Sequence, residues 1–276
     1  ACEPTIPLTI HRDYGLPADV SGRPAVMEGL PLIIISSFSG NTEETVDAYD
    51  SARAAGRSLI VITAGGELLV RARRDGAPLI VMPDPTIPPR LAVGYFLRAL
   101  AFITGAKAIG DELESLAPTL NLAAIETEGR LLASRLAGRI PLIYSSNRYA
   151  PSAYFWKIML NETAKIPAFS DIVPEENHNE LESLGHSPVA PFTVIILASA
   201  DDDLRITRRF VSMVDTFRPL KIPVEQVPLA GGIPTARVVH SILLASFTAL
   251  ALAETRQVDP DATPTIENFK RHVSFL

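Results

Sequence analysis

Residues 32–45, LIIISSFSGNTEET, decide how the first half of the chain folds. They begin with an uninterrupted apolar run rich in β-branched side chains, which predicts a buried strand over 32–36. Small, mostly hydroxylated residues follow, and the acidic pair after them suits the first turn of a helix. The stretch therefore predicts a strand, a serine-rich turn and a helix that Asn41 or Thr42 caps.

The serine-rich turn has the composition of an anion site. A helix that begins directly after a strand presents backbone N–H groups, and these bind anions. Gly40 would let the backbone approach a ligand, and Ser37, Ser39 and Thr42 would add hydroxyl donors. The turn contains no Lys or Arg, so it suits a phosphate monoester better than a triphosphate with its metal. An ordinary capped turn has the same composition, so these residues alone leave both interpretations open.

The bulk composition limits the class of protein. The 276 residues are enough for two domains, and 47% hydrophobic with 20% charged residues is typical of a well-packed globular chain. A net charge of −6 without a dense Lys/Arg block argues against nucleic acid or an anionic membrane as a partner.

Cysteine use and hydropathy bear on the compartment. The single cysteine, Cys2, has no partner for an intramolecular disulfide, so we expect the reducing cytoplasm. The longest apolar stretch, 241–253, is too short to span a bilayer and predicts a buried helix. The N-terminus lacks a signal-peptide pattern.

Strand-like and helix-like segments alternate along the chain, which predicts parallel strands joined by right-handed crossovers. In the first half we expect strands at 5–10, 32–36, 58–63 and 78–82, helices at 42–55, 68–74 and 90–104, and a loop at 13–31. After one or two connecting helices in 113–136, we expect strands at 140–145, 193–198 and 224–227, helices at 152–165, 204–216, 237–254 and 265–273, and an irregular stretch at 167–187. The chain is thus predicted to be α/β, with two doubly wound parallel-sheet domains flanked by helices, 1–112 and 113–276.

Common cofactor motifs are missing. The five histidines (His11, His178, His186, His240 and His272) are scattered rather than spaced as metal ligands. The dinucleotide, P-loop and nucleophile-elbow patterns do not occur. We therefore expect neither a metal nor a cofactor.

Two features in the second half could move protons. Glu162 lies near the end of the helix predicted at 152–165, and His178 lies in the irregular stretch that follows. A carboxylate and an imidazole are a suitable pair for proton transfer near neutral pH. Taken alone, Glu162 is better explained as a solvated residue paired with Lys165, and His178 as an exposed loop residue.

Several motifs together resemble a known family. SSFSGNTEET at 36–45, ITAGG at 62–66 and PPR at 88–90 resemble the first domain of the sugar isomerase (SIS) superfamily. The second half contains, in the matching order, LNETAK at 160–165, PEENHNEL at 174–181, VDP at 258–260 and a lysine at 270. This order resembles the bifunctional phosphoglucose/phosphomannose isomerases of archaea and some bacteria. The resemblance runs from about residue 14 to the C-terminus.

The resemblance implies an aldose–ketose isomerase that needs no metal. It would interconvert glucose 6-phosphate, and mannose 6-phosphate as well, with fructose 6-phosphate through a cis-enediol intermediate. The residues implied to hold the substrate are Ser37, Ser39, Gly40, Asn41, Thr42 and Thr263. The residues implied in catalysis are Glu162, Arg90, His178 and Lys270.

Each residue has an implied role. Glu162 would move a proton between C1 and C2, and Arg90 would stabilise negative charge on the intermediate. His178 and Lys270 would assist ring opening, with His178 reaching the site from the partner subunit of a homodimer with shared active sites. Thr263 would leave room for either configuration at C2.

The N-terminal part departs from the family pattern. Family members usually begin with a strand that ends in a Gly-Gly-Ser loop, whose serine also binds the phosphate, and residues 1–31 contain no such loop. Two explanations stay open: the sequence is incomplete at this end, or the first domain lacks its first strand and loop. The missing loop also leaves open a non-catalytic protein that binds or senses a sugar phosphate.

Overall fold

The computed structural model describes residues 6–18, 31–83, 86–186 and 190–273. The chain divides into two compact units, Cys2–Asp111 and Glu112–Leu276, the latter grouped with Ala1. Each unit is described here by itself.

The first unit contains a three-stranded parallel sheet in the order β1-β2-β3. Its strands are β1 (Ile33–Ser36), β2 (Leu59–Thr63) and β3 (Leu79–Val81). Its helices are α2 (Glu43–Ala54), α3 (Gly66–Arg74), the 3₁₀ turn η1 (Pro89–Leu91) and α4 (Val93–Ile103). Helix α5 (Lys107–Leu116) crosses the boundary between the units.

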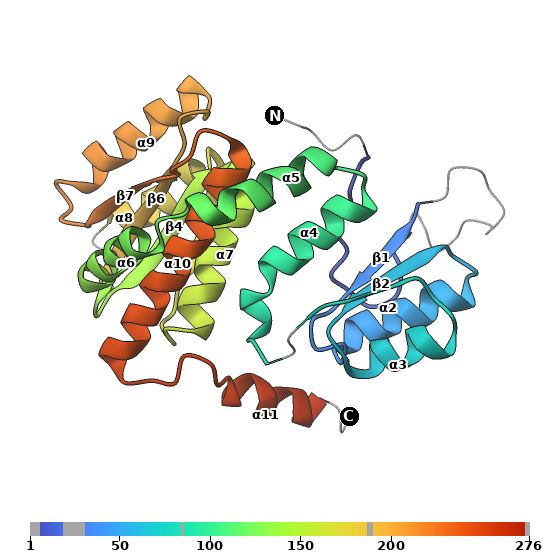
Figure 1. Ribbon diagram of the computed structural model, residues 1–276. Coiled ribbons are helices and arrows are strands. Elements are labelled where there is room, and N and C mark those ends of the chain that lie inside the picture. Colours follow the sequence, from blue (N-terminus) through green and yellow to red (C-terminus); the bar gives the residue numbers. More distant parts are fainter. Residues whose placement is uncertain (1–5, 19–30, 84–85, 187–189, 274–276) are drawn as a thin grey trace. The chain divides into compact units, whose positions relative to one another are not determined.

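Both faces of this sheet are covered, because its strand residues alternate between two apolar clusters. Val61 on β2 packs with Tyr49 of α2 and Leu68 of α3, whereas the next residue, Ile62, packs with Ala99 of α4. Figure 1 shows α2 and α3 together beside β1 and β2. This alternation is what a doubly wound parallel sheet requires.

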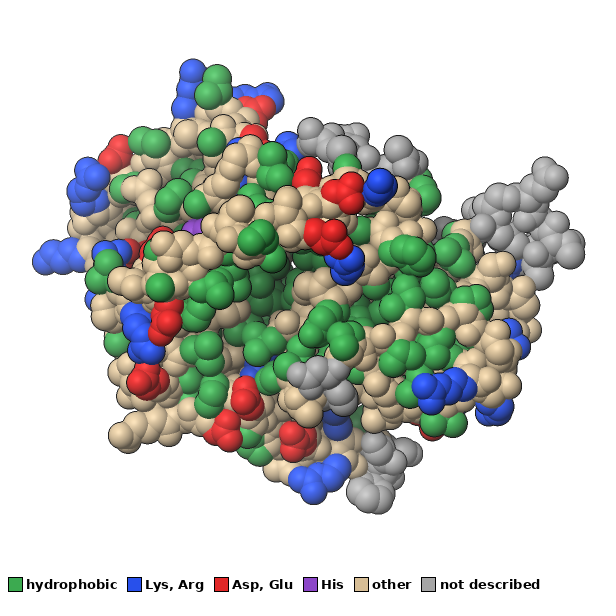
Figure 2. Space-filling view, in the orientation of Figure 1, with side chains coloured by type: hydrophobic (Ala, Val, Ile, Leu, Met, Phe, Trp, Pro, Cys, Tyr) green, Lys and Arg blue, Asp and Glu red, His purple; other side chains and the backbone are tan. Residues whose placement is uncertain are grey.

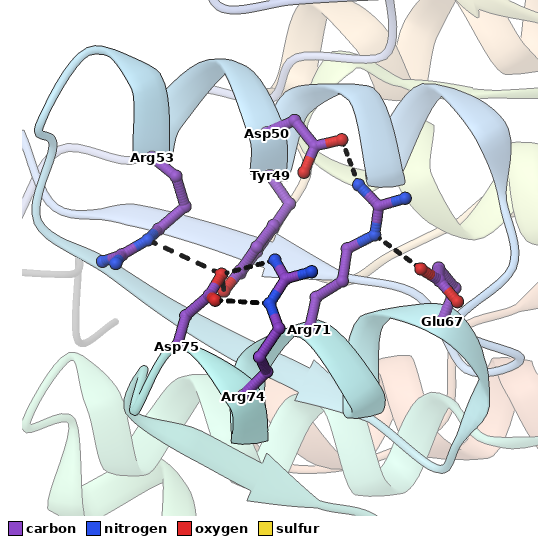
Figure 3. Close-up of polar contacts among 7 residues, drawn as sticks. All are labelled: Tyr49, Asp50, Arg53, Glu67, Arg71, Arg74 and Asp75. Carbon is purple, nitrogen blue, oxygen red and sulfur yellow. Dashed lines mark hydrogen bonds and ion pairs between the residues drawn. The ribbon is translucent and has the colours of Figure 1, made fainter.

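Ion pairs and a tyrosine hydrogen bond join α2 to α3 and to the residue that follows α3 (Figure 3). Asp75, directly after α3, accepts a hydrogen bond from Tyr49 Oη at 2.9 Å and one from Arg74 Nε at 2.7 Å. Arg71 pairs with Asp50 of α2 and with a glutamate one turn earlier on α3. The arginine bonds and the Tyr49 hydroxyl lower the pKa of Asp75 to about 2.

The second unit contains a four-stranded parallel sheet in the order β5-β4-β6-β7. Its strands are β4 (Ile140–Ser146), β5 (Phe169–Val173), β6 (Phe192–Ala198) and β7 (Val224–Pro228). Its helices are α6 (Leu122–Leu136), α7 (Ala150–Glu162), α8 (Glu180–Gly185), α9 (Leu204–Phe217), α10 (Pro234–Arg256) and α11 (Pro264–Val273). Short 3₁₀ turns are η2 (Ala117–Thr119), η3 (Asn147–Tyr149) and η4 (Glu175–His178).

Two apolar clusters again cover the two faces of the sheet. The larger cluster joins β4 and β6 to α6, α7 and α10, with fully buried Trp156 donating from its indole N–H to Ser241 Oγ at 3.0 Å. The smaller cluster joins the other side chains of these strands to α9, and Figure 1 shows α9 apart from α6, α7 and α10. The predicted fold class, α/β with doubly wound parallel sheets, is confirmed.

Helix α10 is longer than the helix expected at 237–254. Among the residues that the structure describes, it is the one helix long and apolar enough to cross a membrane. The expectation that this apolar segment is too short to span a bilayer therefore does not hold for the whole helix. The helix packs against α6 so closely that a Cβ on Gly129 would lie 2.8 Å from Phe247 Cβ. It is the core helix of the second unit.

Three segment predictions are wrong or incomplete. Residues 6–10 do not form the expected strand, although Ile6, Leu8 and Ile10 alternate and are exposed. The stretch 167–187 is not irregular, because it contains β5, η4 and α8; polar and half-exposed positions hid this edge strand. Helix α7 ends at Glu162 because Lys165 adopts a φ of +56°. Residues 5, 19–30 and 187 of the predicted segments lie outside the described residues.

Candidate functional site

The serine-rich turn after β1 interlocks with the turn after β2. Gly40 and Gly66 have φ values of +69° and +67°, and a Cβ on Gly40 would lie 1.9 Å from the carbonyl oxygen of Gly65. A Cβ on Gly66 would lie 2.2 Å from the carbonyl oxygen of Ser39. Both glycines are therefore required by the contact between the two turns.

Three hydroxyls gather in the first of these turns. Ser37 Oγ and Thr42 Oγ1 are hydrogen-bonded at 2.8 Å, and the amide of Gly40 donates to Ser37 Oγ at 3.2 Å. The amide of Asn41 donates to Ser39 Oγ at 3.3 Å, and Ser39 is exposed. The hydroxyls thus surround the start of α2, where helix geometry leaves the first amides without intrahelical acceptors.

The helix caps differ from those predicted. Thr42 precedes α2 but makes no side-chain capping bond, because its hydroxyl pairs with Ser37. Asn41 does cap a helix, but it is α3: its Oδ1 accepts from the amide of Glu67 at 2.9 Å. The side chain therefore ties the first turn to the next helix instead of its own.

Arg90 lies in the same unit as this turn. It belongs to η1 and is buried, with 9% of its surface exposed. Phe38, within the serine-rich turn, and Ala92, shortly after Arg90, belong to one apolar cluster. The fold therefore brings the segment that carries Arg90 beside the serine-rich turn.

A cavity of about 590 Å³ adjoins the same turn. It lies between the extended segment 7–13 and the edge strand β1, and its wall includes Ser36 and Thr42 together with His11 and Arg12. Neither His11 nor Arg12 was predicted from the sequence to be a site residue. Only the fold shows that these residues, far from any recognised motif, lie in the same wall as the turn.

A second strand-to-helix turn with serines follows β4, and carboxylates occupy it. Asp202 accepts from Ser146 Oγ at 2.5 Å and from the amide of Ser199 at 2.7 Å. Asp201 accepts from Tyr149 Oη at 2.9 Å and pairs with Arg237 at 2.6 Å. Burial alone would raise the pKa of Asp201, but hydrogen bonds from Ser199 and Tyr149 and the arginines lower it. This turn is filled by the chain's own anions.

Glu162 is the last residue of α7 and is half-buried. The preceding residue, Asn161, accepts the amide of Ala168 at 2.9 Å, which fixes the end of α7 beside the start of β5. The ammonium of Lys165 donates to the backbone carbonyl of Glu162 and, at 2.6 Å, to that of Ala262. The end of α7 is therefore bound to two other segments.

The other predicted residues of the second unit are more exposed. His178 ends η4, after β5, and its side chain is exposed. Thr263 is half-buried just before α11, and its carbonyl accepts the amide of Glu267 at 3.0 Å. Lys270 lies on α11 and is exposed.

Glu162 and His178 lie near opposite ends of β5. Glu162 is beside the start of the strand, whereas His178 follows its end. Because a strand rises about 3.3 Å per residue, the five-residue β5 places the two segments about 16 Å apart in one chain.

A buried carboxylate beside His178, that of Glu176, was not predicted from the sequence. Glu176 is fully buried, and its Oε2 accepts from Asn177, whereas its Oε1 has no hydrogen-bond partner among the residues that the structure describes. Burial and the nearby Glu180 raise its pKa to about 7. Glu180 in turn accepts from Tyr144 Oη at 2.7 Å. A polar motif of this kind gives no sequence signal for burial.

Two further features bear on possible ligands: the grouping of metal-ligating side chains and the charge of the surface. The described residues contain no group of three or more His, Cys, Asp or Glu side chains that could hold a metal ion. On the face in Figure 2, basic and acidic side chains are interspersed and form no large field of one sign.

A family model and two solved structures identify the fold of this chain. A family model described as the bacterial phospho-glucose isomerase C-terminal SIS domain matches residues 125–273. The structure of glucosamine-6-phosphate deaminase from Thermotoga maritima is similar, with a TM-score of 0.65, 14% identity, and coverage of 84% of this chain and 73% of that chain. A glucose-6-phosphate isomerase-like protein from Thermus thermophilus gives a TM-score of 0.60 at 19% identity, covering 91% and 84%. The chain thus has the fold of the sugar isomerase (SIS) proteins.

A relative of similar sequence shows to which family of SIS proteins the chain belongs. The bifunctional phosphoglucose/phosphomannose isomerase of Caldicellulosiruptor bescii is 32% identical over 98% of this chain and 82% of its own length. The chain belongs to the bifunctional phosphoglucose/phosphomannose isomerase family.

Proposed function

We propose that this chain interconverts glucose 6-phosphate and mannose 6-phosphate with fructose 6-phosphate. The observation that carries the proposal is 32% identity, over 98% of the chain, with a relative of that name. The serine-rich turn, Arg90 and the end of α7 offer residues suited to each step of such a reaction. The reducing cytoplasm is the compartment we expect.

In this proposal, the turn between β1 and α2 holds the sugar 6-phosphate. The hydroxyls of Ser37, Ser39 and Thr42, the backbone at Gly40 and Asn41, and the first amides of α2 are its donors. The second serine turn is a poor alternative, because Asp202 already accepts from its hydroxyl and amide donors. One phosphate site per chain is therefore expected.

Proton transfer is assigned to Glu162. Its carboxylate would remove a proton from C2 of the open-chain aldose and return it to C1, through a cis-enediol. The half-buried position allows contact with a substrate while the end of the helix is held by Asn161 and Lys165. Arg90 would stabilise the negative charge on the intermediate, since a guanidinium stays protonated throughout.

Ring opening is assigned to His178 and Lys270, in a homodimer with shared sites. The separation of about 16 Å along β5 supports this arrangement, since it leaves His178 away from the Glu162 of its own chain. Thr263, just before α11, would accept either configuration at C2 because its side chain is small.

A coupled assay tests the proposed function. Conversion of fructose 6-phosphate is followed through glucose 6-phosphate with a dehydrogenase, and mannose 6-phosphate is followed in parallel as substrate. We expect turnover of both epimers. Calorimetric binding of a hexose 6-phosphate without turnover would contradict the isomerase and favour a non-catalytic sugar-phosphate-binding protein.

A further inference from the structure

Lys165 lies at the meeting point of three segments of the second unit. It follows the end of α7, which carries Glu162, and its ammonium donates to the backbone carbonyl of Glu162. The same ammonium donates to the carbonyl of Ala262 at 2.6 Å, next to Thr263 and just before α11. Its own carbonyl accepts from Arg256, the last residue of α10, at 3.5 Å.

The backbone at Lys165 has a conformation that usually selects glycine. Its φ is +56°, and the amide of Ile166 bonds to the carbonyl of Leu160 at 3.1 Å, which closes the end of the helix. A side chain makes this left-handed conformation unfavourable, and hydrogen bonds made by the lysine can offset that cost. The two carbonyl acceptors of Lys165 receive such bonds.

The helix end itself favours a cation. The last carbonyls of α7 have no intrahelical donors, and they form the negative end of the helix dipole. The ammonium of Lys165 donates a hydrogen bond to one of them, the carbonyl of Glu162. It donates a second hydrogen bond to the segment before α11. We call this pair of bonds, from Lys165 Nζ to the carbonyls of Glu162 and Ala262, the Lys165 bridge.

The segment on the other side of the bridge is held locally. Asp259 Oδ1 accepts the amides of Asp261 and Ala262, at 2.8 and 3.2 Å, so residues 259–262 form a tight turn. A displacement of Ala262 would therefore move this turn and the start of α11 together. Thr263 and Lys270 both lie after this turn in the chain, and Lys270 lies on α11.

We propose that Lys165 is a positioning residue, which holds the proton-transferring end of α7 in register with the segment that carries Thr263 and Lys270. The proposal rests on the proposed isomerase function and assigns Lys165 a role through the two segments that it joins. Loss of the bridge lets Glu162 move relative to C1 and C2, and lets Thr263 move relative to the group that distinguishes the epimers. The phosphate turn belongs to the other unit and keeps its own contacts.

Three variants separate this role from folding. Lys165→Met keeps the length of the side chain without its donors, and Lys165→Gly suits the φ of +56° while removing the bridge. Lys165→Arg keeps donors that can reach carbonyls. The matched control is Lys221→Met, because Lys221 is an exposed lysine of the same unit with a φ of +58°.

We expect Lys165→Met and Lys165→Gly to lower kcat by about 10- to 100-fold, the effect of a small misplacement of a reacting group. KM should change less than kcat, and the ratio of rates for glucose and mannose 6-phosphate should shift. Lys165→Arg should recover part of the rate, and Lys221→Met should match the wild type. Wild-type kcat and epimer ratio in Lys165→Gly would overturn the proposal.

Hydrogen exchange tests the bridge without relying on turnover. Lys165→Met should speed amide exchange in residues 259–267 relative to the wild type and to Lys221→Met. Unchanged exchange there would overturn the proposal. A wild-type chain with no turnover would overturn the proposed function instead, while the exchange result would still show whether Lys165 holds the segment.

Discussion

The side chain of Asn41 accepts a hydrogen bond from the amide of Glu67 at 2.9 Å, so the turn before α2 caps the start of α3. The phosphate-binding candidates are thereby fixed by a neighbouring helix, and the order of the turn depends on the docking of α3. An anion site preorganised in this way loses little freedom when it binds.

Replacing Asn41 by alanine should lower the free energy of unfolding by about 1 kcal/mol, the usual cost of losing a cap. It should also raise KM for hexose 6-phosphates, since the turn loses its tie to α3. Asn121 caps α6 through the amide of Ala124 at 3.1 Å, in the other unit, and Asn121→Ala is the control. Equal KM values in the two variants would contradict the link between this cap and substrate binding.

The close contact between the turns at Gly40 and Gly66 leads to a prediction about stability. Gly40→Ala must hold a φ of +69° and place a Cβ 1.9 Å from the carbonyl of Gly65, so we expect a loss of about 2–5 kcal/mol. Gly65→Ala meets no atom within 4 Å and should be tolerated. Thermal or urea unfolding measures both, and an equally stable Gly40→Ala protein would show that the turns do not interlock.

Glu176 predicts a pH dependence of stability. Its ordinary pKa of 4.5 is raised to about 7 in the fold, so the folded chain holds a proton that the unfolded chain releases. Its contribution to stability is fully present below pH 4.5, falls as the pH rises and is lost above about 7. Glu176→Gln should therefore raise Tm more at pH 8 than at pH 5.

The neighbouring Glu175 is the control for this measurement, because it lies in the same 3₁₀ turn but is exposed. Glu175→Gln should show a similar change in Tm at both pH values. If Glu176→Gln gave the same Tm shift at pH 5 and pH 8, the pKa of the buried carboxyl would not be raised in the fold.

The proposed shared site predicts complementation between subunits. Glu162→Gln and His178→Ala homodimers should both be nearly inactive, because each lacks one of the proposed groups in every site. Mixed dimers, formed by co-expression with two different tags, contain one site with both groups intact and should recover part of the activity. The same low rate in purified mixed dimers would place His178 and Glu162 in the same chain's site.

The sequence predicted the elements with strong apolar runs and missed those without them. The runs at 32–36 and 193–198 correspond to β1 and β6, because buried parallel strands are continuously apolar. Strand β5 has an exposed Phe169 and polar neighbours, so its pattern resembles a loop. The alternating residues 6–10 show the opposite error, since a strand pattern forms a strand only where a partner edge pairs with it.

The local sequence predicted less of the candidate site than of the fold. The serine-rich turn was predicted from composition, but the role of Asn41 as a cap for α3 depends on a contact 26 residues away. The burial of Glu176 and the two acceptors of Lys165 likewise follow from long-range packing. Motifs could select Glu162 and His178, whereas the groups that hold them became visible only in the fold.

The most direct test of the account is the turnover of Glu162→Gln. General acid–base catalysis contributes about 10²–10⁴-fold, so kcat for fructose 6-phosphate should fall by that factor while hexose 6-phosphate binding stays close to that of the wild type. The control is Glu182→Gln, an exposed glutamate of α8, which should keep the wild-type rate. A wild-type kcat in Glu162→Gln would contradict the account, because another residue would then move the proton.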